Sequence, residues 1–453
     1  MNTKALRQKI LDLAIHGKLV PQDPNDEPAS VLLERIRDEK ERLIKEGKIK
    51  RPKKIKTTSD KPHYENVPFE VPSSWIWSTV NEINMYNSKN VDPAKQKENT
   101  FELYSVPIFP TNTPEIIKGE KIGSAKQSVE NGDVLLCKIN PKINRVWFVK
   151  NRTENTMIAS SEWIVIRNKF MLTDYLVFCF MSPYFRDLME NNVSGVGGSL
   201  TRAQLSMVAN YAIPIPPLQE QKRIITEIKH WFELIDVIDQ GKECLQGTIK
   251  KAKSKILDLA IHGKFVPQVP TDEPASELLK RINPKAEITC DNGHYQKLPE
   301  GWVITPMQTL CALVDGEKQN GIERINLDVK YLRGEREAKV LTSGKYTTAN
   351  TLLILVDGEN SGEVFRAPVD GYQGSTFKQL SIHEEMYTDY VLQVINLHRK
   401  TLRENKVGSA IPHLNKKLFK AINVPIPPYE EQKRIVNAIN QTFTILDKIM
   451  ENL

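Results

Sequence analysis

A heptad pattern of apolar residues crosses the middle of the chain. From Ile224 to Leu259, eleven positions follow one another at alternating steps of four and three, and ten of them are apolar. This spacing predicts one long helix with a coiled-coil seam. Gly263 suits the position after its last turn, whereas Gly241 and Gly247 weaken its middle by roughly 1 kcal/mol each relative to alanine.

The same seam continues at both ends of the chain. Residues about 428–453 repeat the first part of the central pattern, and residues about 3–16 repeat its last part. We therefore predict that the terminal helices together form a composite helix, antiparallel to the central one about a pseudo-two-fold axis. The alternative is a set of ordinary core helices in separate domains. The predicted seam consists of Ile224, Ile228, Ile235, Ile238, Leu245, Ile249, Ile256, Leu259, Ile435, Ile439, Leu446, Ile449, Leu6, Ile10 and Leu13.

Two long repeats account for this circular order. KILDLAIHGKLVPQDPNDEPAS at 9–30 recurs at 255–276 with 19 of 22 residues identical, and IPIPPLQEQKRI at 213–224 recurs at 424–435 with 9 of 12 identical. A weaker pair, VPSSW at 71–75 and LPEGW at 298–302, lies between them. The regions that follow, about 76–212 and 303–423, show no comparable identity. The chain is therefore a duplicated module whose frame was kept while its contents diverged.

The divergent regions have the pattern of mixed domains. Aromatic and β-branched residues typical of strands fill segments 132–139, 145–150, 161–167, 331–334, 351–358 and 363–368, and helical patterns follow at 174–190 and 389–405. We predict an α/β (α+β) fold class, with two globular domains separated by a pair of long antiparallel coiled-coil helices. The predicted order is a repeat block (1–36), a basic linker (37–66), a first domain (67–212), the central helix (213–264), a second block and linker (265–297), a second domain (298–423) and the C-terminal helix (424–453).

The composition and the cysteine pattern suggest where in the cell the protein is located. The 453 residues are 40% hydrophobic and 26% charged, which is ordinary for a globular protein. No apolar stretch reaches the roughly 18–20 residues that span a bilayer, and the N-terminus lacks the pattern of a signal peptide. The five cysteines are scattered and form no Cys-x-x-Cys. We expect neither disulfides nor a zinc site, and a reducing cytoplasm as the location.

The positive charge of the chain is local. The net charge is +7, but residues 37–61 hold eleven lysines and arginines against five acidic residues, and the rest is about neutral. The run KIKRPKKIK at 48–56 supplies most of this excess. Two interpretations of the run stay open: a solvated linker, or an arm that contacts phosphates.

Motifs for catalysis are missing from the sequence. It contains no Gly-x-x-x-x-Gly-Lys-Ser/Thr loop, no Gly-x-Gly-x-x-Gly after a strand and no Asn/Asp-Pro-Pro-Tyr/Phe. GVGG at 195–198 suits a turn or hinge, and the Glu-x-Lys triplets at 337–339 and 404–406 suit solvated surface. His16 and His262 stand at matching helix ends, where a capping role fits. We therefore predict no catalytic residue and no metal site.

The duplicated blocks point to a known family. ILDLAIHGK and P-I-P-P-x-x-E-Q-K-R-I, which bracket two dissimilar domains, resemble the specificity subunit of type I restriction–modification systems. VLLCKINP and ILVDGENSGEVF also resemble that family's target recognition domains. The resemblance implies a subunit without catalysis that reads an asymmetric bipartite site on double-stranded DNA. It further implies two methyltransferase subunits, which use S-adenosylmethionine, and restriction subunits, which use ATP and Mg, with no cofactor on this chain.

The resemblance to a DNA reader makes basic and amide side chains of the two domains candidate contacts. Arginine and lysine bind phosphates or guanine, and asparagine pairs with adenine. For each residue, a solvent-exposed or turn role is the competing interpretation. The candidates are Lys138, Asn140, Lys142, Asn144, Arg145 and Arg202 in the first domain, and Arg333, Arg336, Lys339, Asn360, Arg366, Lys416 and Lys417 in the second.

Other classes of function stay open at this point. A protein-interaction scaffold with two binding heads and no DNA specificity would need the same two domains on a frame. A self-contained nuclease or methyltransferase is a third possibility, against which the missing motifs argue. DNA affinity that falls with rising salt favours the DNA reader, and turnover by the isolated chain favours the enzyme.

Overall fold

The middle of helix α7 (Leu218–Ile261) divides the chain into two units. A computed structural model describes residues 2–51, 68–191, 193–194, 201–285, 298–407 and 412–453. The units are Met1–Gly241 and Lys242–Leu453, and helix α7 (Leu218–Ile261) contributes its first part to one and its last part to the other. Within the described ranges, no helix is long and apolar enough to cross a membrane.

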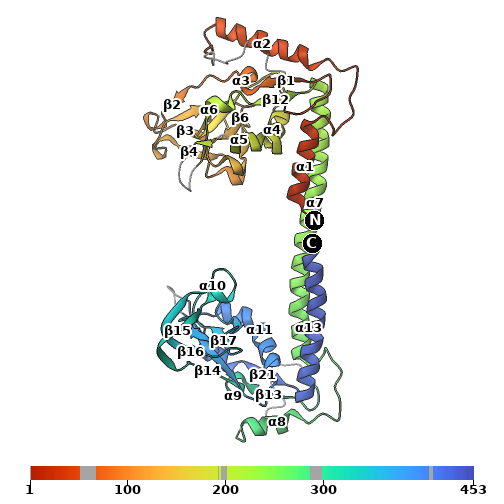
Figure 1. Cartoon of the computed structure of the whole chain (residues 1–453), viewed down its shortest axis with the longest axis vertical. Coiled ribbons are helices and arrows are strands. Elements are labelled where there is room, and N and C mark those ends of the chain that lie inside the picture. The colour runs from red at the N-terminus through yellow and green to blue at the C-terminus, as the bar shows by residue number, and fades with distance from the viewer. Residues whose placement is uncertain (1, 52–67, 192, 195–200, 286–297, 408–411) are drawn as a thin grey trace. The chain divides into compact units, whose positions relative to one another are not determined.

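The first unit combines helices with short strands (Figure 1). Besides α7, its helices are α1 (Thr3–Ile15), α2 (Ala29–Lys45), α3 (Val80–Ile83), α4 (Thr173–Met181), α5 (Pro183–Asn191) and α6 (Leu205–Val208). Its strands are β1 (Ile76–Thr79), β2 (Asn90–Val91), β3 (Thr100–Tyr104), β4 (Glu115–Lys118), β5 (Lys126–Ser128), β6 (Val134–Cys137), β7 (Val146–Phe148), β8 (Thr156–Ala159), β9 (Trp163–Ile166), β10 (Val193–Ser194), β11 (Arg202–Ala203) and β12 (Ala212–Ile215).

The second unit is built in the same order from different contents. Its helices are α8 (Ala275–Ile282), α9 (Met307–Leu310), α10 (Val329–Leu332), α11 (Thr388–Glu404), α12 (Lys416–Ala421) and α13 (Tyr429–Glu451). Its strands are β13 (Val303–Pro306), β14 (Cys311–Val314), β15 (Lys318–Leu327), β16 (Val340–Thr347), β17 (Leu352–Leu355), β18 (Val364–Arg366), β19 (Gly371–Gln373), β20 (Phe377–Ile382) and β21 (Asn423–Ile426).

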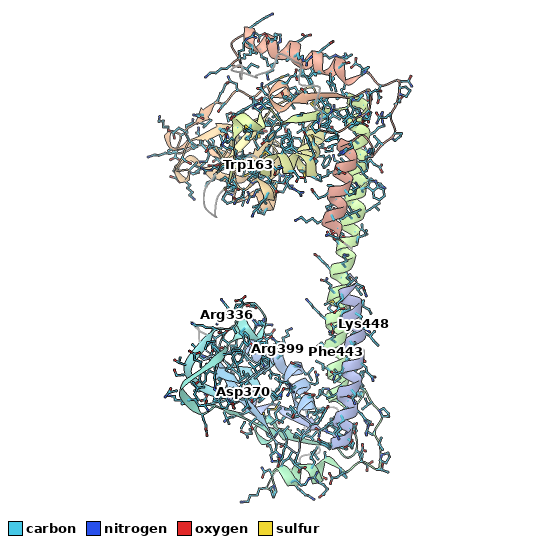
Figure 2. The ribbon with its side chains drawn as sticks, in the orientation of Figure 1. Trp163, Arg336, Asp370, Arg399, Phe443 and Lys448 are labelled. Carbon is cyan, nitrogen blue, oxygen red and sulfur yellow. The ribbon has the colours of Figure 1, made fainter. Side chains whose placement is uncertain are left out.

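The sheets separate a shared frame from divergent contents. In both units the strand that enters the variable region pairs antiparallel with the strand that leaves it, β1 with β12 and β13 with β21. The first unit adds the sheets β7-β6-β9 and β2-β5-β8-β3-β4, whereas the second adds β14-β20-β17-β18 and a closed β15-β16-β19 barrel. Trp163, labelled in Figure 2, is fully buried with Tyr104 and Trp147, and this cluster links the two larger sheets of the first unit.

Each unit contains one antiparallel pair of helices. In the first, Arg7 of α1 pairs with Asp236 at 2.6 Å, and Asp26, in the segment after α1, pairs with Arg223 at 2.6 Å. Later residues of the N-terminal segment therefore meet earlier residues of α7, as in an antiparallel pair. In the second, Lys253 pairs with Asp447 at 2.5 Å, and α13 lies along the last part of α7 (Figure 1). The predicted antiparallel helices are therefore present within each unit.

The heptad seam is buried where a partner helix covers α7. Ile224, Ile228, Ile235 and Ile249 are buried, as are Ile10, Ile435 and Ile439; Ile238, Ile256, Leu259, Leu6, Leu13 and Leu446 are half-buried. Leu245 and Ile449, however, are 39% and 41% exposed. In the last turns of α7, Leu257, Ala260 and Ile261 are more deeply buried than the predicted Ile256 and Leu259, because this part of the helix also faces the core of the second unit.

A buried carboxylate fastens the frame in each unit. Glu220 accepts hydrogen bonds from the Trp75 indole at 2.9 Å and from Gln22 at 2.6 Å. Glu431 accepts the matching bonds from Trp302 and Gln268, both at 3.1 Å. Burial raises the pKa of both carboxyl groups above the ordinary value, although these hydrogen bonds act in the opposite direction. The glutamate of the repeated EQKR motif therefore has the same structural role in both units.

The next residue of that motif attaches the variable domain. Gln221 donates to the Pro216 carbonyl at 3.0 Å and accepts from the Leu172 amide at 3.0 Å. Gln432 makes the same two bonds, to Pro427 at 3.1 Å and from Tyr387 at 3.0 Å. One amide side chain in each unit thus ties the start of a long helix to the divergent domain.

Two predicted elements differ from the structure. The helical stretch 174–190 is two helices, α4 and α5, because Pro183 disfavours helical geometry at Ser182. Segment 331–334 is no strand but the end of α10 and the residues after it. Asp328 begins that helix, since its carboxylate accepts hydrogen bonds from the amides of Lys330 and Tyr331, both at 3.1 Å.

Candidate nucleic-acid interface

All six candidates of the first unit lie around one hairpin. Strands β6 and β7 pair in the register Val134 to Phe148, and the loop between them covers residues 138–145. Arg202 comes from a distant part of the chain but forms a β-bridge with Ile139 in this loop. The structure therefore gathers Lys138, Asn140, Lys142, Asn144, Arg145 and Arg202 into one surface region.

The two asparagines of this loop set its backbone. Asn140 and Asn144 have positive φ values of 46° and 50°, on either side of a 3₁₀ turn at Pro141–Ile143. Asparagine tolerates this left-handed region better than most residues do. Asn140 also holds the neighbouring segment, since its Oδ1 accepts from the Thr201 amide at 3.3 Å. Both residues therefore have a turn role that needs no nucleic acid.

The cations of the loop differ in their partners. Arg145 donates to the Ile139 carbonyl at 3.1 Å and so braces the loop, and Arg202 pairs with Glu162 at 3.0 Å. Within the described residues, no carboxylate pairs with Lys138 or with the exposed Lys142. Lys142 is therefore the candidate of this loop whose charge is best placed for an external anion.

A buried thiol lies beneath the same loop. Cys137 ends β6, and burial raises the pKa of its thiol, so that it stays neutral at ordinary pH. Arg145 Nη1 lies 3.7 Å from the Cys137 sulfur. The base of the loop is thus an apolar support, and its charges are carried by side chains above it.

The second unit contains the same hairpin. Strands β17 and β18 pair from Leu352 to Arg366, residue for residue as β6 and β7 do. The loop 356–363 has the length of loop 138–145, and Gly358 and Gly362 take the positive φ positions of the two asparagines, at 109° and 92°. The hairpin backbone is therefore shared even though the sequences of the two loops differ.

Only part of the second set of candidates lies near this loop. Asn360 is in the loop itself, and Arg333 forms an ion pair with its Glu363. Lys416 and Lys417 begin α12, shortly after the β-bridge between His413 and Asp357, and both are exposed. These four residues form the second candidate region.

Three further candidates lie elsewhere in the second unit. Arg366 is opposite Leu352, at the other end of the hairpin, and contacts Asp389 at 3.3 Å. Arg336, labelled in Figure 2, pairs with Asp328 beside α10. The carbonyl of Lys339 accepts from the Asn326 amide at 2.7 Å, next to the barrel. The structure does not bring these three to the loop.

The sequence analysis missed three nitrogen-bearing side chains, of one arginine, one lysine and one histidine, beside loop 356–363. Arg399 of α11, labelled in Figure 2, contacts Glu363 at 2.9 Å. Lys406 contacts Glu359 at 3.0 Å, and His413 contacts Asp357 at 2.6 Å. The only signal in the sequence was indirect, since three carboxylates in a loop of eight residues attract cations from other elements.

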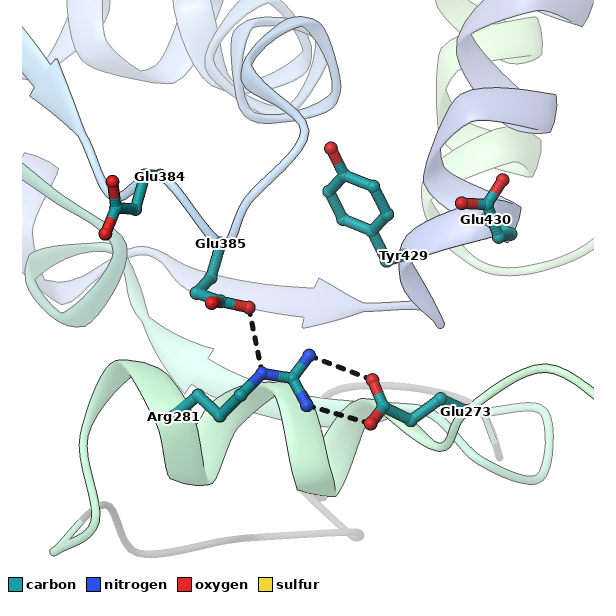
Figure 3. Close-up of a pocket in the computed structure, with 6 residues that line it drawn as sticks. All are labelled: Glu273, Arg281, Glu384, Glu385, Tyr429 and Glu430. Carbon is teal, nitrogen blue, oxygen red and sulfur yellow. Dashed lines mark hydrogen bonds and ion pairs between the residues drawn. The ribbon is translucent and has the colours of Figure 1, made fainter.

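A pocket on the second unit has the wrong charge for DNA. Arg281 is held by both oxygens of Glu273, at 2.8 and 2.9 Å, and by Glu385 at 2.9 Å (Figure 3). The other residues that line the pocket are Glu384, Tyr429 and Glu430. Four glutamates surround one neutralised arginine, so this surface repels phosphates.

The comparisons with known proteins agree on one family. Residues 72–245 and 299–453 match the family described as the type I restriction modification DNA specificity domain. The specificity subunit of type I restriction enzyme EcoAI from Escherichia coli is 31% identical over 405 residues, which cover 76% of this chain and 68% of that protein. The EcoEI specificity subunit, also from Escherichia coli, is 32% identical over 342 residues, covering 65% of this chain and 57% of that protein.

A solved structure shares the fold. It belongs to work described as the structural basis of complex assembly and conformational transition of the type I R-M system. The match has a TM-score of 0.60 at 19% identity and covers 85% of this chain and 94% of that one. At this identity the likeness concerns the fold alone.

Proposed function

Because the chain belongs to the family of type I restriction–modification DNA specificity subunits, we propose that it selects a bipartite DNA site and performs no catalysis itself. Each unit holds one variable domain, and the two domains differ in their sheets. Two different readers on a repeated frame would recognise two different half-sites. The observation that carries this proposal is the pair of hairpins in one register, with candidate contacts at both loops.

The partners follow from the repeated frame. Each unit presents an antiparallel helix pair on the same internal frame, which favours one methyltransferase subunit per unit. Restriction subunits would complete the assembly. In this proposal S-adenosylmethionine, ATP and Mg belong to the partner subunits. A cytoplasmic location fits the described cysteines, Cys137, Cys179, Cys244 and Cys311, which are free; Cys290 lies outside the described residues.

The decisive experiment combines the full chain with its methyltransferase partners. Adenine methylation mapped on a random DNA library should show one bipartite, non-palindromic motif, and binding should weaken steeply as salt rises. Methylation without a sequence motif, or a chain that binds no DNA even with its partners, would instead favour the protein-interaction scaffold. None of the comparisons supports that alternative.

A further inference from the structure

The two hairpin loops carry opposite charges on one backbone. Loop 138–145 reads KINPKINR and contains three basic residues and no acidic one. Loop 356–363 reads VDGENSGE and contains three acidic residues and no basic one. The strand register and the positions of positive φ are the same in both. The shared backbone therefore does not require the charge difference. In the second unit the three carboxylates pair with side chains of neighbouring elements, whereas Lys142 of the first loop has no carboxylate partner within the described residues.

The charged side chains at the two tips are accessible. Lys142 is exposed, and the side chain of Glu359 is 81% exposed. The Lys406–Glu359 pair at 3.0 Å lies at the surface, where such pairs contribute little, about 0–1 kcal/mol. Glu359 can therefore exchange this partner for another hydrogen-bond donor at small cost.

An acidic tip is compatible with DNA because cations surround it. Arg333 and Arg399 share the carboxylate of Glu363. Lys416 and Lys417 are exposed at the start of α12. With Lys406, these cations outnumber the three carboxylates of the loop. Phosphates can thus be neutralised by residues around the loop, which leaves its carboxylates for base edges.

We propose that the two tips read base edges of opposite hydrogen-bond polarity, an inference that rests on the proposed DNA-reading function. Lys142 donates to an acceptor edge, for which guanine with O6 and N7 is the best match. Glu359 accepts from an exocyclic amino group, for which N4 of cytosine is the best match. Each half-site then contains a G·C pair, which the first unit reads through the guanine and the second unit through the cytosine.

The test uses the full chain with its methyltransferase partners. The wild type, Lys142→Gln and Glu359→Gln are compared by methylation of a random DNA library. We expect Lys142→Gln to reduce the preference for one guanine about tenfold or more in one half-site only. Glu359→Gln should do the same for one cytosine in the other half-site. Glu337→Gln, which removes an exposed carboxylate outside the loop, is the matched control and should leave the motif unchanged.

Distinct results would overturn the inference. If Glu359→Gln strengthens binding equally on all sequences, Glu359 merely repels phosphates. If Lys142→Gln weakens binding equally on all sequences and lowers the salt dependence by about one ion, Lys142 is a phosphate contact. Unchanged motifs in both variants would also overturn it. A wild-type complex without any bipartite motif would instead refute the proposed function itself, so the two failures are distinguishable.

Discussion

Lys253 Nζ lies 2.5 Å from Asp447 Oδ1 in the second unit, and this pair has a counterpart in the first. There Arg7, at the matching repeat position, contacts Asp236 at 2.6 Å. Each cation also lies over an aromatic ring, Lys253 over Phe443 at 4.9 Å and Arg7 over Phe232 at 5.0 Å. The same three-residue contact therefore sets the register of both helix pairs.

Removal of this contact should loosen one helix pair. We expect Lys253→Ala to lower the free energy of unfolding of the second unit by about 1 kcal/mol, the sum of a partly exposed ion pair and a cation–π contact. Lys253→Arg should restore it, because the first unit uses arginine here. Urea unfolding measures the change, with Lys251→Ala as an exposed control on the same helix. Equal losses in Lys253→Ala and Lys251→Ala would contradict the assignment.

The buried Glu431 should make stability depend on pH. Because its pKa is raised in the folded chain, the folded state binds more protons than the unfolded one between the ordinary value of 4.5 and the raised value. Its contribution to stability is therefore greatest below pH 4.5 and is lost as pH rises through the raised pKa. Glu431→Gln should remove this loss. The free energy of unfolding of the wild type should therefore fall relative to that of the variant as the pH rises toward neutrality.

Urea unfolding at several pH values measures this difference. Glu430→Gln is the matched control, since the Glu430 side chain is adjacent in sequence but 61% exposed. Its stability should run parallel to that of the wild type at every pH. A wild type and a Glu431→Gln variant that also run parallel would show that Glu431 has the same pKa in the folded and unfolded chain.

Two glycines, one within α7 and one just after it, should respond to alanine with opposite signs. A Cβ at Gly247 meets no atom within 4 Å, so Gly247→Ala should stabilise α7 by up to about 1 kcal/mol. Gly263 has a φ of +68°, and a Cβ there would lie 2.3 Å from Pro299 Cγ. Gly263→Ala should therefore destabilise by more than the roughly 1–2 kcal/mol of left-handed strain. Thermal unfolding of both variants gives the comparison, and a stabilised Gly263→Ala would refute the C-terminal turn.

Substitutions of Asn144 can distinguish a role in the turn from a role in base reading. The second unit uses Gly362 at this position, so Asn144→Gly should keep both the stability and the DNA motif. Asn144→Ala should cost about 1 kcal/mol, because alanine is strained at positive φ. Unfolding midpoints and the methylation motif are the measurements. A changed motif in Asn144→Gly, with stability kept, would make Asn144 a base reader after all.

The frame of this fold was predictable because repetition reveals it. The heptad spacing located α7, and the repeats located the antiparallel partners of its two ends. The spacing missed helix boundaries that depend on single residues. Ser182 breaks a helix through its proline neighbour, and Asp328 begins one through its carboxylate. Single residues decide such boundaries, and periodicity does not detect them.

The candidate site was predictable only where it is continuous in sequence. Loop 138–145 carries its own cations, so five of six candidates in the first unit are chain neighbours. The second loop carries carboxylates, and its cations are Arg399 of α11, Lys406 just after α11 and Arg333 just after α10. Arg366 is a basic residue of the kind expected at a DNA contact, but it lies at the end of the hairpin that is opposite the loop. Which distant residues meet is determined by tertiary packing, which pattern alone does not reveal.

The two hairpin loops have equal length and follow strands of matching register. Both hairpins leave and rejoin their sheets at matching residues, so substitutions within the eight loop positions leave the three residue pairs between the two strands in place. Few codons therefore need to change for a tip to meet a different partner, provided that neighbouring side chains such as Arg333 and Arg399 still suit the new loop. A changed preference for a DNA sequence can then be inherited without any change of fold.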